Sequence, residues 1–158
     1  MLVLTTAFLY KTNAQPVCLN FDPIFERQQL QSNHSGKVLD LHPLSTNGYT
    51  YWALKVEELP YIEDNICRDT MPDYFIPYFT GDRFCAGYTN KSSLCRGDSG
   101  GGLAFPDNSQ GVERYYLRGI VSISPLIQSS RCNVLSFITF TNISQYEQLI
   151  TDSLQKNR

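Results

Sequence analysis

A run of glycines around one serine most constrains how this chain can fold, because it demands a tight, exposed turn. The run reads Arg96-Gly97-Asp98-Ser99-Gly100-Gly101. Glycines at 97 and 100 let the backbone turn sharply and approach a bound molecule without a Cβ in the way. The Ser99 hydroxyl is a candidate nucleophile, and the N–H groups of Gly97 and Ser99 are candidate donors to an oxyanion. Asp98 is a candidate buried carboxylate, which needs a cationic partner.

Size and charge limit the classes of protein that fit. The 158 residues, 42% of them apolar, suffice for one domain around one core. The net charge is −2 and like charges do not cluster, so neither nucleic acid nor an anionic membrane surface is an expected partner. No apolar run approaches the length that spans a bilayer.

The cysteines and the glycosylation sequons favour an oxidising compartment. Five cysteines stand at positions 18, 67, 85, 95 and 132, an odd number that leaves at least one without a partner in the chain. They form no Cys-x-x-Cys pair, which argues against a zinc site. We expect neither a metal nor a cofactor. Three sequons are present: Asn33-His34-Ser35, Asn90-Lys91-Ser92 and Asn142-Ile143-Ser144. Together these features predict a secreted, extracellular glycoprotein.

The amino terminus has two interpretations. Residues 1–10 are apolar apart from two threonines, and Thr12-Asn13-Ala14 offers a small-residue cleavage site, which resembles a signal peptide. No positive charge precedes the apolar stretch, and this favours the second interpretation, a buried strand over Leu2-Val3-Leu4.

Strand patterns dominate the rest of the chain. Apolar alternation and β-branched or aromatic residues predict strands over 38–41, 49–56, 102–105, 115–124 and 135–141. Loops rich in Asn, Ser, Gly and Pro are predicted over 32–36, 45–48, 106–111 and 124–130. A short helix is expected near 63–68. A longer one should begin at the capping box Ser144-x-x-Glu147 and lay the stripe of Tyr146, Leu149, Ile150 and Leu154 on a sheet. Many short strands with a terminal helix indicate an all-β barrel or sandwich.

Two alternatives for the glycine run remain beside an active serine loop. Gly97-x-Ser99-x-Gly101 also satisfies the nucleophile elbow of α/β-hydrolases, but that fold needs a histidine after the serine and none follows Ser99. The other alternative is a plain glycine-rich turn, which does not require Cys95, Asp98 and Ser99 in this order.

From about Gln15 onward the chain resembles the C-terminal half of a chymotrypsin-fold serine protease of the trypsin family (peptidase S1). The resemblance rests on the Gly-Asp-Ser-Gly-Gly run and on three further segments: Gln15 to Leu19, Phe84 to Tyr88, and Leu117 to Ser122. The sequence from Tyr115 to Gly119 resembles that of secreted insect proteases of modular or clip-type cascades. The implied fold is the second six-stranded antiparallel barrel of a double barrel plus a C-terminal α-helix, with the first barrel largely missing. Residues 1–30 would be a remnant of the first barrel and the inter-barrel connection, and residues 31–158 the second barrel.

The resemblance also assigns roles to individual residues. It implies disulfides between Cys67 and Cys85 and between Cys95 and Cys132, with Cys18 bridging to an upstream segment; a buried free thiol is the alternative for Cys18. Ser99 would be the catalytic nucleophile, Gly97 and Ser99 the oxyanion hole, and Asp98 the partner of a new amino terminus released by activation cleavage. The residues implied in substrate binding are Ser93, Ser122, Ile123, Ser124 and Ile138.

The pocket would not suit a basic side chain. Its base is Ser93, where trypsin-like relatives carry an aspartate, so cleavage after Lys or Arg is disfavoured. We expect small or medium apolar residues to be preferred.

The family's catalytic histidine and aspartate belong to the first barrel, and their motifs are absent from this sequence. His34 and His42 lie in predicted loops, far from where the resemblance places the base. We therefore expect the isolated polypeptide not to be an efficient protease. Two functions remain: a serine endopeptidase acting on protein or peptide substrates, represented here without its N-terminal half, or a catalytically inactive homologue that acts as a secreted binding or regulatory module.

Overall fold

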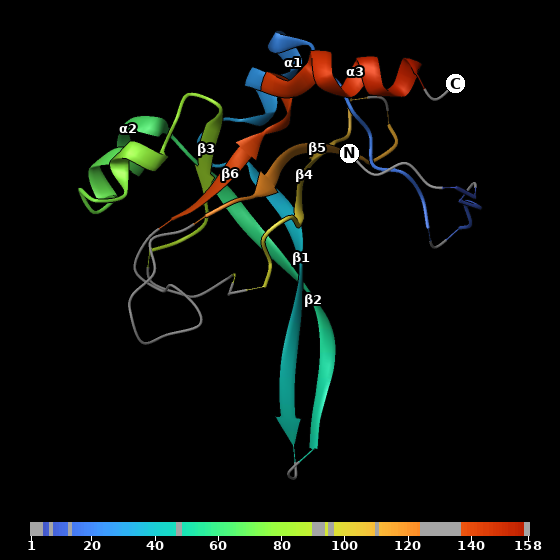
Figure 1. Ribbon diagram of the computed structural model, residues 1–158, viewed down its shortest axis with the longest axis horizontal. Coiled ribbons are helices and arrows are strands. Elements are labelled where there is room, and N and C mark those ends of the chain that lie inside the picture. The colour runs from blue at the N-terminus through green and yellow to red at the C-terminus, as the bar shows by residue number, and fades with distance from the viewer. Residues whose placement is uncertain are drawn as a thin grey trace.

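The computed structural model describes residues 5–6, 8–12, 14–46, 49–89, 94, 97–109, 111–123 and 137–156, with side chains left out over 41–46 and 50–52. Its centre is a closed antiparallel barrel (Figure 1). The strands are β1 (Ser35–Thr46), β2 (Tyr49–Ile62), β3 (Arg83–Ala86), β4 (Gly102–Asp107), β5 (Arg114–Val121) and β6 (Ile138–Asn142). Their order around the barrel is β1-β2-β3-β6-β5-β4. The expected six-stranded antiparallel barrel is thus confirmed.

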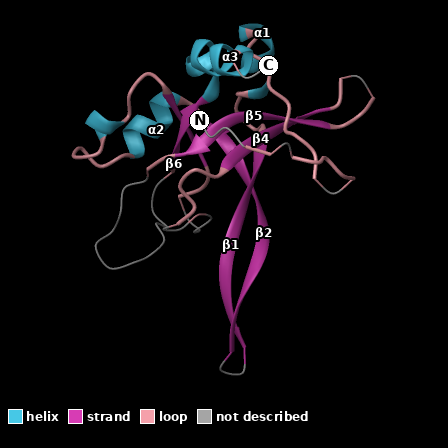
Figure 2. Ribbon diagram, turned by 45° about the vertical axis from the view of Figure 1, so that its right-hand side comes forward, coloured by secondary structure: helices cyan, strands magenta, loops and turns pink. Residues whose placement is uncertain are grey.

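The first two strands are much longer than predicted. They form a hairpin whose far part projects away from the barrel (Figures 1 and 2). Pairing is continuous from Ser35 with Pro60 to Thr46 with Tyr49. Residues 45 and 46, which were predicted to lie in a loop, therefore belong to β1. Only Lys37 and Val38 of β1 also pair with β4, so the barrel closes at the base of the hairpin.

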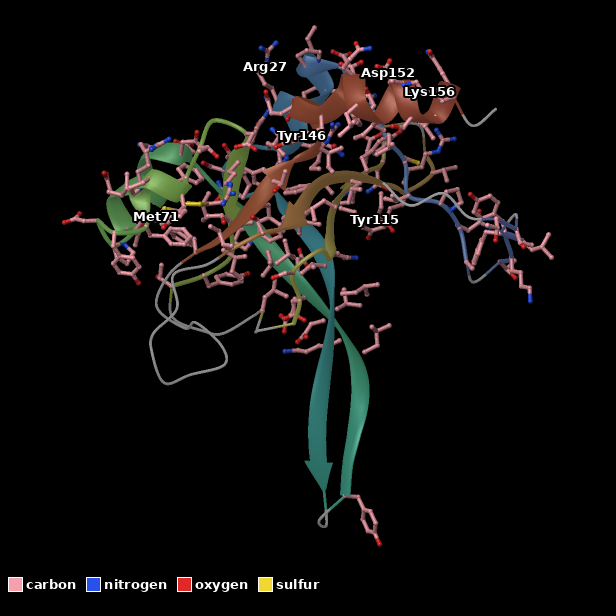
Figure 3. The ribbon with its side chains drawn as sticks, in the orientation of Figure 1. Arg27, Met71, Tyr115, Tyr146, Asp152 and Lys156 are labelled. Atoms are coloured by element: carbon pink, nitrogen blue, oxygen red, sulfur yellow. A yellow bond between two sulfur atoms is a disulfide. The ribbon has the colours of Figure 1, made fainter. Side chains whose placement is uncertain are left out.

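Apolar side chains fill the barrel. The buried cluster inside it comprises Val38, Leu59, Phe84, Ala86, Leu94, Leu103, Phe105, Val121, Ile138 and Phe140. A second buried cluster lies under α2 (Asp64–Thr70) and the short 3-10 helix η1 (Ile76–Tyr78), and it comprises Cys67, Met71, Phe75, Phe79, Cys85 and Phe137. A disulfide joins Cys67 to Cys85 there, beside Met71 (Figure 3). This is the pair that the resemblance implies.

A helix that the sequence patterns did not predict, α1 (Pro23–Gln29), packs against the outside of the barrel. Asp22 caps it, because its Oδ1 accepts a hydrogen bond from the Ile24 N–H at 2.8 Å, and Pro23 stands at the first helical position. A bulge in β5 provides its anchor: Leu103 pairs with Gly119 but Ala104 pairs with Leu117, so Arg118 is the extra residue.

The C-terminal helix differs from the prediction in two ways. The 3-10 helix η2 (Ile143–Tyr146) comes first, because the Asn142 side chain accepts from the Ser144 N–H at 2.9 Å and starts a turn there, so Ser144 is not the N-cap of α3 (Glu147–Gln155). The prediction that the apolar stripe of this helix packs on a sheet is wrong, since the side chains of Leu149 and Leu154 are 62% and 53% exposed. α3 lies beside α1 at one end of the barrel, and it extends past the strands instead of covering a sheet (Figures 1 and 2).

Candidate active site

The Ser99 loop is held against the end of β5 by backbone hydrogen bonds. The Gly100 N–H donates to the Val121 carbonyl at 2.9 Å, and the Val121 N–H donates to the Gly101 carbonyl at 2.8 Å. The Gly101 N–H closes a turn onto the Asp98 carbonyl at 3.0 Å. Gly97 and Gly100 have φ of +117° and +93°, a left-handed conformation that side chains disfavour. The glycines of the run therefore shape the turn that carries the exposed Ser99.

Ser99 is exposed, as a nucleophile must be to meet a substrate. Its Oγ donates to the Ser122 carbonyl at 3.3 Å. Within the described part of the chain, no histidine bonds to this hydroxyl, and the amides of Gly97 and Ser99 have no backbone partner. Two N–H groups without a described backbone partner, beside an exposed hydroxyl, are the elements that an oxyanion hole needs.

Asp98 is half-buried and interacts with at least one other group in the structure. Several predicted site residues lie outside the described part of the chain: Cys95, residues 90–93, Ser124 and Cys132. The proposed pocket base, Ser93, and the disulfide between Cys95 and Cys132 therefore stay predictions.

Two described residues of the expected substrate pocket, Ser122 and Ile123, directly follow the last residue of β5. Ser122 is half-buried and Ile123 is 37% exposed. Thr139 of β6 braces both: its carbonyl accepts from the Ser122 N–H at 3.0 Å, and its N–H donates to the Ile123 carbonyl at 3.2 Å. Ile138 lies inward, 6% exposed, in the barrel core. Sequence reasoning missed Thr139, because only the pairing of distant strands brings it to this edge.

Neither histidine stands near Ser99. His34 lines a shallow pocket together with Gln29, Phe105 and Pro106. Phe105 and Pro106 lie near the end of β4, whereas the Ser99 loop enters β4 at Gly102, so the two places are about 10 Å apart along the strand. The backbone of His42 pairs with Ala53 in the projecting hairpin, and its side chain lies outside the described part. The structure thus gives no base to Ser99 among the described residues.

Cys18 is a half-buried free cysteine. Its backbone forms a parallel bridge to β5, with its N–H on the Tyr115 carbonyl and its carbonyl on the Leu117 N–H, each at 3.0 Å. The expected bridge from Cys18 to an upstream segment stays a prediction. No described helix is long and apolar enough to cross a membrane.

Comparison with known proteins agrees with this geometry. The chain matches the family model described as Trypsin over residues 1–150. Limulus clotting factor C of Carcinoscorpius rotundicauda is 30% identical over 145 residues, which cover 90% of this chain and 14% of the relative. The modular serine protease of Drosophila melanogaster is 24% identical over 168 residues, covering 99% and 24%. The chain spans about a seventh to a quarter of the length of these curated relatives.

Melanization protease 1 of Drosophila melanogaster is 46% identical over 46 residues, 29% of this chain and 12% of the relative. With the barrel, the serine turn and a family match over nearly its whole length, the chain belongs to the trypsin family of serine proteases.

Proposed function

We propose that this chain supplies the nucleophile, oxyanion hole and substrate pocket of a serine endopeptidase that cleaves peptide bonds through an acyl-enzyme. The observation that carries the proposal is the turn that presents the exposed Ser99 between two glycines with positive φ, Gly97 and Gly100, and is held to Val121 by the backbones of Gly100 and Gly101. In such a reaction the Ser99 Oγ attacks the substrate carbonyl, and the amides of Gly97 and Ser99 donate to the oxyanion.

The base and the acid that orients it belong, in this proposal, to a first barrel. The support is the present partner of Ser99: its hydroxyl donates to the Ser122 carbonyl, which cannot take a proton as a base does. Asp98 then acts by pairing with the cation of a newly released amino terminus and so shapes the oxyanion hole. The alternative, a catalytically inactive homologue that acts as a binding or regulatory module, becomes an outcome of the test.

The pocket fits small or medium apolar side chains of a protein substrate. Ser93 would lie at its base, and Ser122, Ile123 and Ser124 would form its wall, with Ile138 buried behind them in the barrel core. None of these residues carries a negative charge, so a buried Lys or Arg side chain would lose its hydration without gaining a partner. A preference for Arg in an active form would overturn this assignment.

We also propose that the protein is secreted. The disulfide between Cys67 and Cys85 is of a kind that persists in oxidising compartments. The three sequons in the sequence agree with passage through the secretory route.

The test compares labelling of Ser99 by a fluorophosphonate probe in two forms of the protein. The first form is the chain alone, and the second carries the first barrel of a trypsin-family protease ahead of Met1, with Ser99→Ala as the control for each. We expect the chain alone to react as slowly as its Ser99→Ala control, and the two-barrel form to react about 100-fold faster or more. Rapid labelling of the chain alone would overturn the need for a first barrel.

Absence of any acceleration in a folded two-barrel form would favour the inactive homologue instead. Near-ultraviolet circular dichroism and a cooperative urea transition establish that this form is folded before its reactivity is interpreted.

A further inference from the structure

We propose that Asn33 carries an N-linked oligosaccharide in the folded, secreted protein, and that Asn142, which lies in an equally valid sequon, does not. The two sequons are alike in sequence, and only the structure distinguishes them. The proposal rests on the secretory route proposed above and is independent of the chemistry of Ser99.

Asn33 lies in an exposed turn between α1 and β1. The turn is closed by the His34 N–H, which donates to the Gln31 carbonyl at 3.0 Å. Asn33 has a φ of +72°, a left-handed conformation that asparagine tolerates better than most residues. Its side chain is exposed, so the amide nitrogen is accessible to a substituent.

Attachment there is a balanced group transfer from a lipid-pyrophosphate-linked oligosaccharide. The Asn33 Nδ2 forms a bond to C1 of the first sugar, while the bond between that C1 and the phosphate oxygen breaks. The lipid pyrophosphate leaves with the electron pair, and the amide releases one proton. Neither oxidant nor reductant is needed, and the chain contributes only the exposed amide and the Ser35 hydroxyl of the sequon.

Asn142 uses both ends of its amide inside the fold. Its Nδ2 donates to Glu26 Oε1 of α1 at 2.8 Å, and its Oδ1 accepts from the Ser144 N–H at 2.9 Å to start η2. A sugar on Nδ2 would stand between the end of β6 and α1, where Glu26 now lies. A chain modified at Asn142 would therefore lose the contact of α1, and we expect it to be absent from the folded, secreted pool.

The experiment expresses the full chain behind a secretory leader in mammalian cells and digests the secreted protein with peptide-N-glycosidase F in H₂¹⁸O. This enzyme converts each glycosylated asparagine to an ¹⁸O-labelled aspartate, which peptide mass spectrometry reads separately at positions 33, 90 and 142. We expect the label at position 33 and none at position 142. An unlabelled position 33, or a labelled position 142, in the secreted pool overturns the proposal.

Matched variants separate the acceptor from its effect on folding. Asn33→Gly keeps the left-handed turn and removes the acceptor, whereas Ser35→Thr keeps a valid sequon. The first should lose one glycan and the second should retain it. Ser144→Ala destroys the sequon of Asn142 but leaves the Asn142 side chain in place, and the buried Ser144 Oγ has no hydrogen-bond partner in the described structure. Ser144→Ala should therefore leave the glycan mass unchanged, and a loss of mass would contradict the proposal.

Chain retained inside the cells is digested in the same way, because transfer precedes folding. An unlabelled position 33 in that material also overturns the proposal, so poor secretion does not leave it undecided.

Discussion

Arg118 Nε donates to Gln29 Oε1 at 2.6 Å, although 89 residues separate the two in the chain and both are buried, at 1% and 5% exposure. The guanidinium also donates through Nη1 to the Asn20 carbonyl at 2.5 Å and lies over the Phe25 ring, 5.2 Å from its centroid. Burial lowers the pKa of Arg118, but an arginine remains charged in proteins. One buried cation thus fastens α1 and the segment before it to the bulge of β5.

Replacing Gln29 with Leu should destabilise the fold by about 2–3 kcal/mol, because a hydrogen bond to a buried charge is lost and the charge stays behind. Arg118 Nη2 already has no hydrogen-bond partner among the described residues, so the cation has no spare partner to turn to. Gln28→Leu, at the exposed neighbouring position, is the control. Urea unfolding measures both, and equal free energies of unfolding for the two variants would contradict this role of Gln29.

Gly119→Ala should cost about 1–3 kcal/mol through overpacking of the barrel core. A Cβ at position 119 would stand 2.7 Å from Phe84 Cζ and 2.9 Å from Phe140 Cβ, closer than real contacts allow. Gly81→Ala is the matched control, because a Cβ there meets nothing within 4 Å. Thermal unfolding should show a lower Tm for the first variant and little change for the second; a Tm of Gly119→Ala equal to that of the unmodified chain would refute the packing argument.

Apolar alternation and β-branched or aromatic residues predicted five of the six described strands, whereas these patterns left a barrel or a sandwich open and the family resemblance implied the barrel. The missed strand β3 has only four residues, and three in succession are buried, so Arg83–Ala86 shows no alternation. The helix α1 had a usable signal in Asp22-Pro23, a capping residue followed by proline at the first helical position, but its one buried residue is a glutamine. Hydrophobic patterns therefore pass over it.

The serine turn could be predicted in detail from its glycines, whereas its surroundings could not. Thr139 reaches the edge of the site only because β6 pairs with both β3 and β5. The bulge that directs Arg118 toward α1 depends likewise on a register shift between β4 and β5. Such features arise from long-range pairing, which local sequence patterns do not encode.

Removal of the disulfide between Cys67 and Cys85 should destabilise the fold by about 3 kcal/mol, because the two residues are 18 apart and their cross-link restricts the unfolded chain. The double variant Cys67→Ala, Cys85→Ala tests this in urea. Cys18→Ser is the control, since the described bonds of Cys18 to β5 are made by its backbone and persist in the variant. A double variant as stable as the control would contradict the prediction.

The contact between Tyr146 and Asp82 should make stability depend on pH in two windows. The hydroxyls of Thr80 and Tyr146 donate to the Asp82 carboxylate and hold its pKa below the usual 3.8. A carboxyl with a lowered pKa in the folded state contributes stability above its unfolded pKa and loses it as the pH falls through the folded value. The same hydrogen bond raises the pKa of Tyr146 above 10, so its contribution is present below pH 10 and is lost as the pH rises through the folded value.

Tyr146→Phe removes that hydrogen bond at the junction of η2 and α3 (Figure 3). The free energy of unfolding of the unmodified chain should therefore exceed that of the variant from about pH 5 to pH 9, and the two should converge below pH 4 and above pH 10. Tyr74→Phe, at a site 63% exposed, provides the control and should differ by the same small amount at every pH. Urea titrations across this range measure the difference, and a pH-independent gap for Tyr146→Phe would show that Asp82 does not act through Tyr146.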